Sequence, residues 1–314
     1  MSRRAHNLGL AGLALVIAAA PLFFPNSYFY DVAVNALLLA VVCVGLNLLI
    51  GYGGQISLGH AGFYALGAYG SALLTGRLGV PPLAALVAAA AAVGTIAYLI
   101  GRPILRLKGH TLAMATLGVG IIIHIVLKTE SGLTGGPDGL AVDPFTVMGV
   151  AVTGDRAWYW VAGAVLLAAV RLAGNLTDSP VGRALRAVHG SEIAAEVMGI
   201  DTARAKVQVF VVSAVFASVA GSLFAHKSGF ITPDIGSFFR SVELVTMVVL
   251  GGMASTHGAV VGAVLLTILP QVLATFEEYE AMVLGAIMMA TMIFLPKGLV
   301  PGIRLAARRW GAVR

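Results

Sequence analysis

The sequence has 314 residues, of which 59% are hydrophobic and 11% charged, and its formal net charge is +6 at pH 7. Ordinary globular proteins have about a quarter of their residues charged, and much of a soluble protein's exterior must be compatible with water, so the composition excludes a soluble enzyme or binding module. The cations stand between apolar runs and not along one face, which excludes a nucleic-acid-binding protein.

Ten apolar runs predict an all-α integral membrane protein that moves a solute across the bilayer. A spanning helix needs about 20 largely apolar residues. The runs that reach or approach this length lie near residues 8–24, 32–50, 61–76, 82–101, 110–127, 157–173, 207–227, 241–254, 258–276 and 281–296. The eighth is the weakest, because Glu243 stands at its start and Gly251-Gly252 near its end. The pattern predicts one transmembrane domain over residues 1–314, with nine or ten spans.

The positions of the cations favour ten spans, since Lys and Arg gather in short cytoplasmic loops. With ten spans and the N-terminus inside, the inner segments hold Arg3, Arg4, Arg102, Arg106, Lys108, Arg171, Arg183, Arg186, Arg204, Lys206, Lys297, Arg304, Arg308, Arg309 and Arg314. The outer segments then hold only Arg77, Lys128, Arg156, Lys227 and Arg240. Nine spans would place the basic tail (Lys297 to Arg314) outside, so we expect ten spans with both termini in the cytoplasm.

The first run resembles a secretory signal, because residues 1–7 are basic and the run ends at Ala18-Ala19-Ala20-Pro21. A proline directly after the cleavage position disfavours cleavage, and further spans follow. We therefore expect a retained first span.

Residues 51–60 (GYGGQISLGH) interrupt the apolar pattern between the second and third runs. They contain four glycines, and Gln55, Ser57 and His60 add polar groups. Non-helical backbone at membrane depth occurs only where protein buries it or where it lines a wet cavity, and glycine-interrupted segments mark substrate routes in transporters. The alternative is a tight turn at the cytoplasmic surface, where glycine permits positive φ. The polar side chains favour a substrate route.

A second interruption, residues 251–258 (GGMASTHG), separates the eighth and ninth runs. It shares the Gly-Gly-x-x-Ser spacing with the first, but glycine and serine are too common here for that likeness to establish an internal repeat. The Gly258-x-x-x-Gly262 spacing and the alanine-rich run 84–92 predict helices whose backbones approach closely.

Several polar residues lie inside or beside the predicted spans, where they turn toward a cavity or another helix. For Asn35, Asn47, His124 and Glu243 an interhelical hydrogen bond is the commoner role. The candidates for the translocation pathway are Asn47, Gln55, Ser57, His60 and Glu243. The scattered histidines and the lack of paired cysteines predict no metal site, and no catalytic cluster is visible, which argues against an enzyme.

No Gly-x-x-x-x-Gly-Lys-[Ser/Thr] loop occurs in the sequence. The chain is therefore expected to bind no nucleotide itself, and uphill transport would have to be driven by another chain or by an ion gradient. Glu243 is the only acidic residue near the core of a span, which weakens a proton-coupled mechanism.

The longest predicted cytoplasmic segment, 174–206, is the place where a driving chain would dock. Ser179-Pro180 predicts a helix start, and this helix is expected to end at Gly190. Ser191 is expected to cap a second short helix over residues 192–198, which Gly199 closes.

The second short helix is predicted to present an apolar knob to a partner. Ile193, Val197 and Ile200 share one face at helical spacing, beside acidic residues. A helix that lies flat on lipid usually carries a basic polar face instead, so a protein partner is favoured.

Five blocks in order resemble the LivM-type permease subunits of bacterial ATP-binding-cassette importers for branched-chain amino acids. They are residues 51–69 (GYGGQISLGHAGFYALGAY), 107–117 (LKGHTLAMATL), 133–140 (LTGGPDGL), 179–200 (SPVGRALRAVHGSEIAAEVMGI) and 251–262 (GGMASTHGAVVG). The likeness extends over almost the whole chain, although His189-Gly190 stands where a charged pair is expected.

This resemblance implies the ten-helix fold of type II importers, with broken or re-entrant segments, in a bacterial inner membrane. It implies as partners a second, LivH-like permease, two cytoplasmic ATPase subunits that bind the ATP and Mg, and an extracytoplasmic amino-acid-binding protein. It also implies that segment 174–206 is the coupling loop, since Glu192, Ala194, Ala195 and Gly199 match the Glu-Ala-Ala…Gly motif that such permeases press into the ATPase.

The mechanism that the resemblance implies is alternating access, in which the ATPases pull the 180–200 helices and the bundle rocks around a central route. The turn-rich outer segment 133–140 is expected either to dock the binding protein or to be an ordinary loop. Two other functions remain open: a stand-alone gradient-driven transporter or channel, and an ATP-driven permease for urea or short amides.

Overall fold

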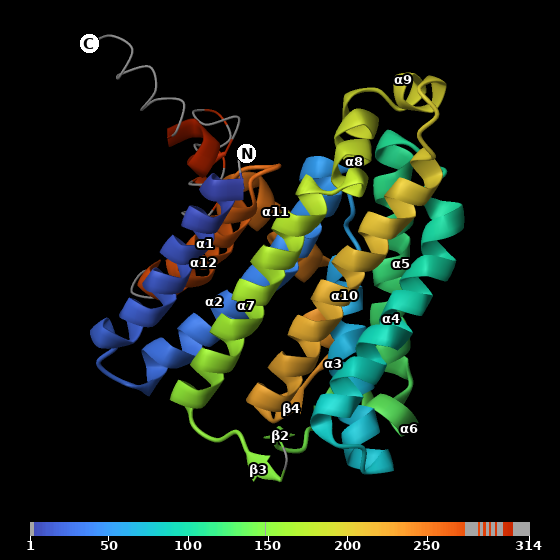
Figure 1. The fold of residues 1–314 in the computed structure, drawn as a ribbon. Coiled ribbons are helices and arrows are strands. Elements are labelled where there is room, and N and C mark those ends of the chain that lie inside the picture. Colours follow the sequence, from blue (N-terminus) through green and yellow to red (C-terminus); the bar gives the residue numbers. More distant parts are fainter. Residues whose placement is uncertain are drawn as a thin grey trace, which may run out of the picture.

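The computed structural model of the chain describes residues 3–147, 149–273 and 298–303, with the single positions 282, 285, 286, 289 and 293. Long helices form a bundle in this part of the chain (Figure 1). They are α1 (Arg3–Ala19), α2 (Ser27–Asn47), α3 (His60–Leu78), α4 (Pro82–Ile104), α5 (Gly109–Thr129), α7 (Asp155–Asp178), α10 (Thr202–Ser228), α11 (Phe238–Gly251) and α12 (Thr256–Leu273).

Shorter elements connect the long helices. The helical ones are η1 (Ala20–Phe23), the π-helix η2 (Leu48–Tyr52), α6 (Ser131–Thr134), η3 (Gly136–Asp138), α8 (Pro180–Gly190), α9 (Glu192–Val197) and η4 (Pro233–Gly236). The antiparallel strand pairs are β1 (Leu140–Ala141) with β4 (Phe230–Ile231), and β2 (Thr146–Val147) with β3 (Val150–Ala151).

Each of the first nine predicted runs coincides with one of these long helices. Five stretches in the described part are long and apolar enough to cross a membrane: Ser27–Tyr52, Pro82–Ile104, Gly109–Thr129, Asp155–Asp178 and Thr202–Ser228. The chain is therefore a mostly helical, multi-pass membrane protein. Most of the tenth predicted run, 281–296, and most of the basic tail lie outside the described residues.

The weak eighth run forms α11, which is only 14 residues long. At 1.5 Å per residue such a helix is about 21 Å long, shorter than the ~30 Å hydrocarbon core. The chain reaches it through the strand β4 and the short helix η4. The segment from 230 to 251 is therefore a broken element whose first part is not α-helical.

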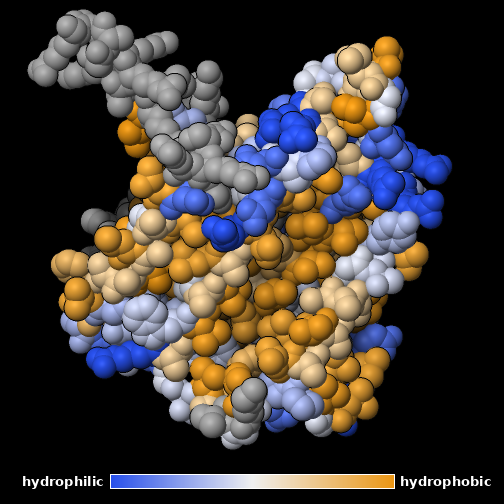
Figure 2. Space-filling model, in the orientation of Figure 1, coloured by the Kyte–Doolittle hydropathy of each residue, from blue (hydrophilic) through white to orange (hydrophobic). Residues whose placement is uncertain are grey.

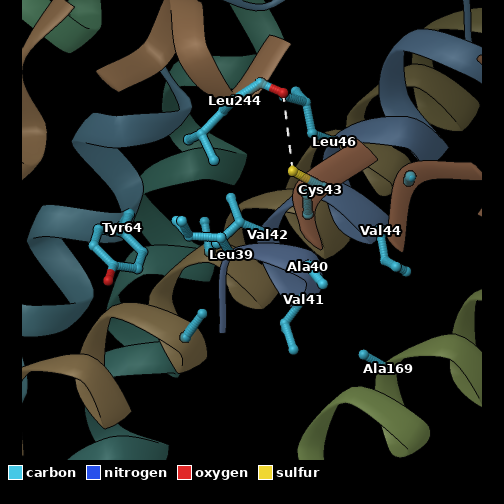
Figure 3. Close-up of a cluster of buried hydrophobic side chains, with 14 of the residues drawn as sticks. Leu39, Ala40, Val41, Val42, Cys43, Val44, Leu46, Tyr64, Ala169 and Leu244 are labelled. Atoms are coloured by element: carbon cyan, nitrogen blue, oxygen red, sulfur yellow. Dashed lines mark hydrogen bonds between the residues drawn. The ribbon is translucent and has the colours of Figure 1, made fainter. Parts of the chain in front are cut away.

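Helix α2 occupies the centre of the bundle, and nine-tenths of its most apolar stretch is buried (89%). A helix that is hydrophobic on all sides is stable only when it is surrounded, and α2 packs against α7, α10, α11 and α12. Cys43 lies in this core, with its Sγ 3.9 Å from the carbonyl oxygen of Leu244 on α11 (Figure 3). It is the only cysteine of the chain, and it is buried.

Close backbone contacts confirm that small residues bring helices together. A Cβ added to Gly262 would lie 2.0 Å from the carbonyl oxygen of Met247, and one added to Gly251 would lie 2.0 Å from that of Gly258. The Gly258-x-x-x-Gly262 pair thus packs α12 directly on α11. In the alanine-rich run of α4, only Ala85, Ala89 and Ala90 are buried.

The two ends of the bundle differ (Figure 1). The helices α8 and α9 project from one end, near the last turn of α4 and the first turns of α5 and α10. The strands and α6 lie at the opposite end. The predicted cytoplasmic segment and the predicted outer loops are therefore at opposite ends of the molecule.

The outer segment 133–140 forms a tight turn, as its glycines predict. Gly135, Gly136 and Gly139 have φ of 76°, 57° and 78°, which side-chain-bearing residues rarely adopt. The hydroxyl of Thr134 donates to the carbonyl of Leu127, 2.6 Å away, and accepts from the amide of Gly136. These bonds fix the turn to the end of α5.

Candidate functional site

The first glycine-rich segment breaks the helix and is mostly buried, although Gly54 and Ile56 are exposed. After the π-helix η2, residues 53–59 are not helical, and α3 begins at His60. The amide of Leu58 donates to Thr116 Oγ1 on α5 at 3.2 Å, and a Cβ on Gly59 would lie 2.2 Å from the carbonyl oxygen of Thr116. The chain is thus not helical over residues 53–59, where the sequence predicts an interruption, and α5 packs against this segment.

The two glycine-rich breaks contact each other. The side chain of Asn47 accepts a hydrogen bond from the amide of Ala254 at 2.9 Å, and a Cβ on Gly51 would lie 2.2 Å from that amide nitrogen. Ala254 is the one described non-glycine residue with positive φ, at 56°. Asn47, which is completely buried, thus holds an unusual backbone turn of the other break.

His60 links the first break to α10. Its Nδ1 is 2.8 Å from Ser57 Oγ, and its Nε2 is 2.7 Å from Ser213 Oγ. The ring packs edge-on against Phe63 and Phe210, and only 1% of His60 is exposed. In the isolated chain, Ser57 and His60 therefore make internal hydrogen bonds between elements.

Gln55 lies in a small polar pocket that also contains a predicted coupling residue. The pocket has a volume of ≈ 170 Å³ and is lined by Gly53, Gly54, Gln55, Leu107, Lys108, Gly109, Val188, His189, Glu192 and Lys206. The side-chain Nε2 of Gln55 donates to the backbone carbonyl of Gly53 at 3.1 Å, while its buried side-chain Oε1 has no partner in the described part of the chain. The pocket brings Gln55 to the same site as Glu192.

Glu192 is held by two lysines that the sequence interpretation missed. Its Oε1 pairs with Lys206 Nζ at the start of α10, and its Oε2 lies 3.6 Å from Lys108 Nζ. The side chain of Lys206 is only 2% exposed and that of Glu192 is 21% exposed. Lys206 stands 14 residues after Glu192, so no local spacing could have paired them. The ion pair fastens α9 to α10.

The helices α8 and α9 begin where the sequence predicts, and α9 ends at Val197, one residue before the predicted end. Ser179 Oγ accepts from the amide of Gly182, and Ser191 Oγ accepts from the amide of Ala194, each at 3.3 Å. Gly199 closes α9 with φ 80°. These side-chain caps are the local signals that fixed both helix starts.

The exposed face of α9 is apolar, but it differs from the prediction, because Ile200 is only partly exposed and Met198 stands beside Ile193 and Val197 instead. Ile193, Val197 and Met198 are 72%, 81% and 81% exposed. Figure 2 shows hydrophobic surface at the tip of the molecule, where Figure 1 places α9, beyond a group of hydrophilic side chains. The sequence predicts acidic residues beside these apolar side chains, and this is wrong for Glu192, which turns inward and pairs with Lys206. The carboxylate of Glu196 accepts a hydrogen bond from the hydroxyl of Thr202. We call Ile193, Val197 and Met198 the α9 tip.

The predicted coupling residues do not share one environment. Ala194 and Gly199 are exposed, whereas Ala195 is 3% exposed and packs inward with Glu192. Met198, which directly follows α9 and which the sequence analysis did not assign to the exposed knob, is 81% exposed.

Glu243 lies on the outside of α11. It pairs with Arg240 one turn earlier, with Nη1 to Oε2 at 2.6 Å, and the two side chains are 29% and 38% exposed. Phe239 on the same helix is 81% exposed. Of the five pathway candidates, Glu243 alone is an ionisable group on a surface of this chain.

The remaining polar residues bond inside the chain. His124 Nδ1 is 3.0 Å from the carbonyl oxygen of Pro233, which ties α5 to η4. Asn35 donates to Asp31 Oδ2 at 3.2 Å on its own helix, so its expected interhelical bond is replaced by a bond within α2.

Replacing Lys206 with methionine is expected to leave Glu192, whose side chain is only 21% exposed, without its closest cation. Removing one partner of a buried pair costs about 3 kcal/mol, so the thermal unfolding midpoint should fall by several degrees, and α9 should detach from α10. The double variant Lys206→Met with Glu192→Gln should recover most of that loss. Lys128→Met, at an exposed site, is the control, and an unchanged midpoint in Lys206→Met would show that the pair stabilises nothing.

Comparisons with known proteins identify relatives over nearly the whole chain. A family model described as "Branched-chain amino acid transport system / permease component" matches residues 28–292. The chain is 36% identical to the high-affinity branched-chain amino acid transport system permease protein LivM of Salmonella typhimurium, over 92% of this chain and 74% of that protein.

Two more distant relatives extend the similarity. The chain is 27% identical to the corresponding permease protein LivH of Escherichia coli, over 89% of this chain and 96% of that protein. It is also 27% identical to the ribose import permease protein RbsC of Escherichia coli, over 81% of this chain and 78% of that protein. No solved structure matches the chain significantly.

Proposed function

Because the chain belongs to the family of permease components of branched-chain amino acid transport systems, we propose that it carries these amino acids across the membrane as one subunit of an ATP-driven importer. It is a transport subunit and not an enzyme. The observation that carries the ATP-driven mechanism is the α9 tip, an apolar surface of Ile193, Val197 and Met198 that projects from the end of the bundle. An exposed apolar patch at the rim of a protein marks a contact with a partner.

The proposed assembly has four kinds of component. This chain would pair with a second permease of the LivH type, and one of two ATPase subunits, which bind ATP and Mg, would dock on the α9 tip. An amino-acid-binding protein would dock at the opposite end, where the fixed turn 133–140 lies. The proposed topology has ten spans, with residues 281–296 as the tenth, and both termini in the cytoplasm of a bacterial inner membrane.

The proposed coupling route runs from α9 into the bundle. A movement of α9 would pull Lys206 on α10 through its ion pair with Glu192. The same pocket contains Gln55 of the first break, and that break contacts the second through Asn47. A displacement of α9 would thus reach both non-helical segments, which is what alternating access between an inward and an outward state requires.

The proposed translocation surface is the exposed face of α11. An ionisable pair facing lipid is costly, so Arg240 and Glu243 are expected to face the second permease across a hydrated route. Asn47, Ser57 and His60 then position the backbone of the breaks, and Gln55 stands at the inner end of the route.

Replacing Glu243 with glutamine is expected to lower leucine uptake about tenfold while the complex still assembles. The change leaves the Arg240 guanidinium without a paired carboxylate at the proposed interface, and an unpaired charge is costly within the membrane. Uptake in proteoliposomes and co-purification of the partners provide the measurement. Glu130→Gln, at an exposed position at the outer end of α5, is the control. Wild-type uptake by Glu243→Gln would remove this face of α11 from the pathway.

The test of the function is reconstitution. Proteoliposomes with both permeases, the ATPase and the binding protein are expected to accumulate leucine when ATP is supplied, and proteoliposomes with this chain alone are expected to accumulate nothing. Accumulation by the single chain would favour a stand-alone gradient-driven transporter.

The choice of solute needs a competition assay, because a ribose permease is similar over most of this chain. Unlabelled isoleucine and valine should compete with leucine uptake, whereas urea, acetamide and ribose should not. Competition by urea or acetamide alone would assign the chain to short amides.

A further inference from the structure

An open groove of ≈ 830 Å³ runs along the outside of the bundle between α4, α10 and the junction of α7 with α8. It belongs neither to the polar pocket at Gln55 nor to the exposed face of α11. Its polar end contains Arg102, Arg106 and Arg204, and its apolar wall includes Leu176, Val211 and Val212.

Within the residues that the structure describes, the three arginines at the polar end have no carboxylate partner. The ion pairs of the described residues involve none of them. Arg102 lies 5.7 Å from the centre of the Tyr98 ring, which positions its guanidinium by a cation–π contact. Asp201 is the one carboxylate of the groove, and its Oδ1 caps α10 by accepting from the amide of Arg204 at 2.9 Å. The groove therefore has a net positive charge, which no ion pair within the described part of the chain neutralises.

The apolar wall begins directly beyond these arginines. Val211 and Val212 follow Arg204 by seven and eight residues on the same helix, which is about 11 Å along its axis. Figure 2 shows this face, with hydrophilic side chains over α8 and the start of α10 and a continuous hydrophobic surface below them. The groove thus runs from a basic end onto an apolar wall, as a site for a headgroup and its acyl chain would.

We propose that this groove binds one anionic phospholipid. Arg102, Arg106 and Arg204 would hold its phosphate, and an acyl chain would lie against Val211 and Val212. Basic pockets between spanning helices at the membrane surface select anionic headgroups, and arginine binds phosphate through two parallel hydrogen bonds. A neutral protein surface would leave three guanidinium groups unpaired, so charge complementarity favours the lipid over the second permease. The site depends on the chain spanning a membrane and not on which solute it transports.

The first test is lipid retention by the assembled transporter, purified in mild detergent and examined by native mass spectrometry. Bound phosphatidylglycerol is expected to survive conditions that remove phosphatidylcholine. The variant R106Q/R204Q should retain at least about tenfold less, whereas K128Q/R171Q, which removes the same number of charges outside the groove, should retain the wild-type amount. Equal retention by the two variants would overturn the proposal.

The second test places a reporter in the groove. Cys43 is buried and is the chain's only cysteine, so Gln208→Cys in the groove provides one reactive thiol for a bimane label. In nanodiscs, spin-labelled phosphatidylglycerol should quench this label more strongly than spin-labelled phosphatidylcholine, and R106Q/R204Q should remove the difference. Equal quenching by both lipids, displacement by inorganic phosphate alone, or cross-linking of the introduced cysteine to the second permease would each contradict a lipid site.

Discussion

Val197→Asp is expected to abolish ATP-driven leucine uptake and co-purification of the ATPase while the permease still folds. Val197 is 81% exposed and belongs to the α9 tip, so its side chain contributes little to the stability of this chain. A carboxylate in the centre of an apolar interface must be desolvated without a partner, which costs several kcal/mol. A loss of 3 kcal/mol alone would weaken the binding more than 100-fold.

The measurement is affinity purification of the tagged permease, followed by quantification of the ATPase and by uptake in proteoliposomes. Val147→Asp is the matched control, because Val147 is an exposed valine in the strand β2 at the opposite end of the bundle. If Val197→Asp recovers as much ATPase as wild type and transports normally, α9 is not the docking element.

Gly221→Ala is expected to remove most of the folded protein from the membrane. A Cβ at Gly221 on α10 would lie 1.9 Å from the carbonyl oxygen of Tyr64 on α3. Because the obstacle is backbone, no rotamer change relieves it, and the two helices would have to separate. Overpacking of this kind costs about 3 kcal/mol or more, a large part of the total stability of a domain.

The comparison that isolates this effect is Gly12→Ala in α1, where an added Cβ meets nothing within 4 Å. Membrane yield and the elution profile in size-exclusion chromatography should be unchanged for Gly12→Ala and severely reduced for Gly221→Ala. Wild-type yield of Gly221→Ala would mean that α3 and α10 are further apart than the structure places them.

Local signals explain which features could be predicted from the sequence. The caps at Ser179 and Ser191 and the turn at Gly199 depend on residues within four positions, and the structure confirms them. The breaks were also predictable, because glycine clusters interrupt apolar runs. The short α11 corresponds to the run that already looked weakest.

Long-range contacts explain what the sequence interpretation missed. Nothing in the spacing of Asn47 and Ala254 indicates that they are hydrogen-bonded across 207 positions. The inward orientation of Glu192 depends on a lysine on another helix. Helical periodicity alone therefore predicted, wrongly, that the Glu192 carboxylate lies beside the exposed apolar side chains. The pairing of Glu243 with Arg240 is local, yet only the fold shows that this pair lies on the outside of the bundle.

The contact between the two breaks has an evolutionary consequence. Asn47 supplies the acceptor for a turn whose φ of 56° at Ala254 is uncommon for an alanine, so the two positions constrain each other although they are far apart in the gene. A lineage that loses the amide at 47 would have to change the turn at 254 as well. Among related sequences, substitutions at positions 47 and 254 should therefore occur together.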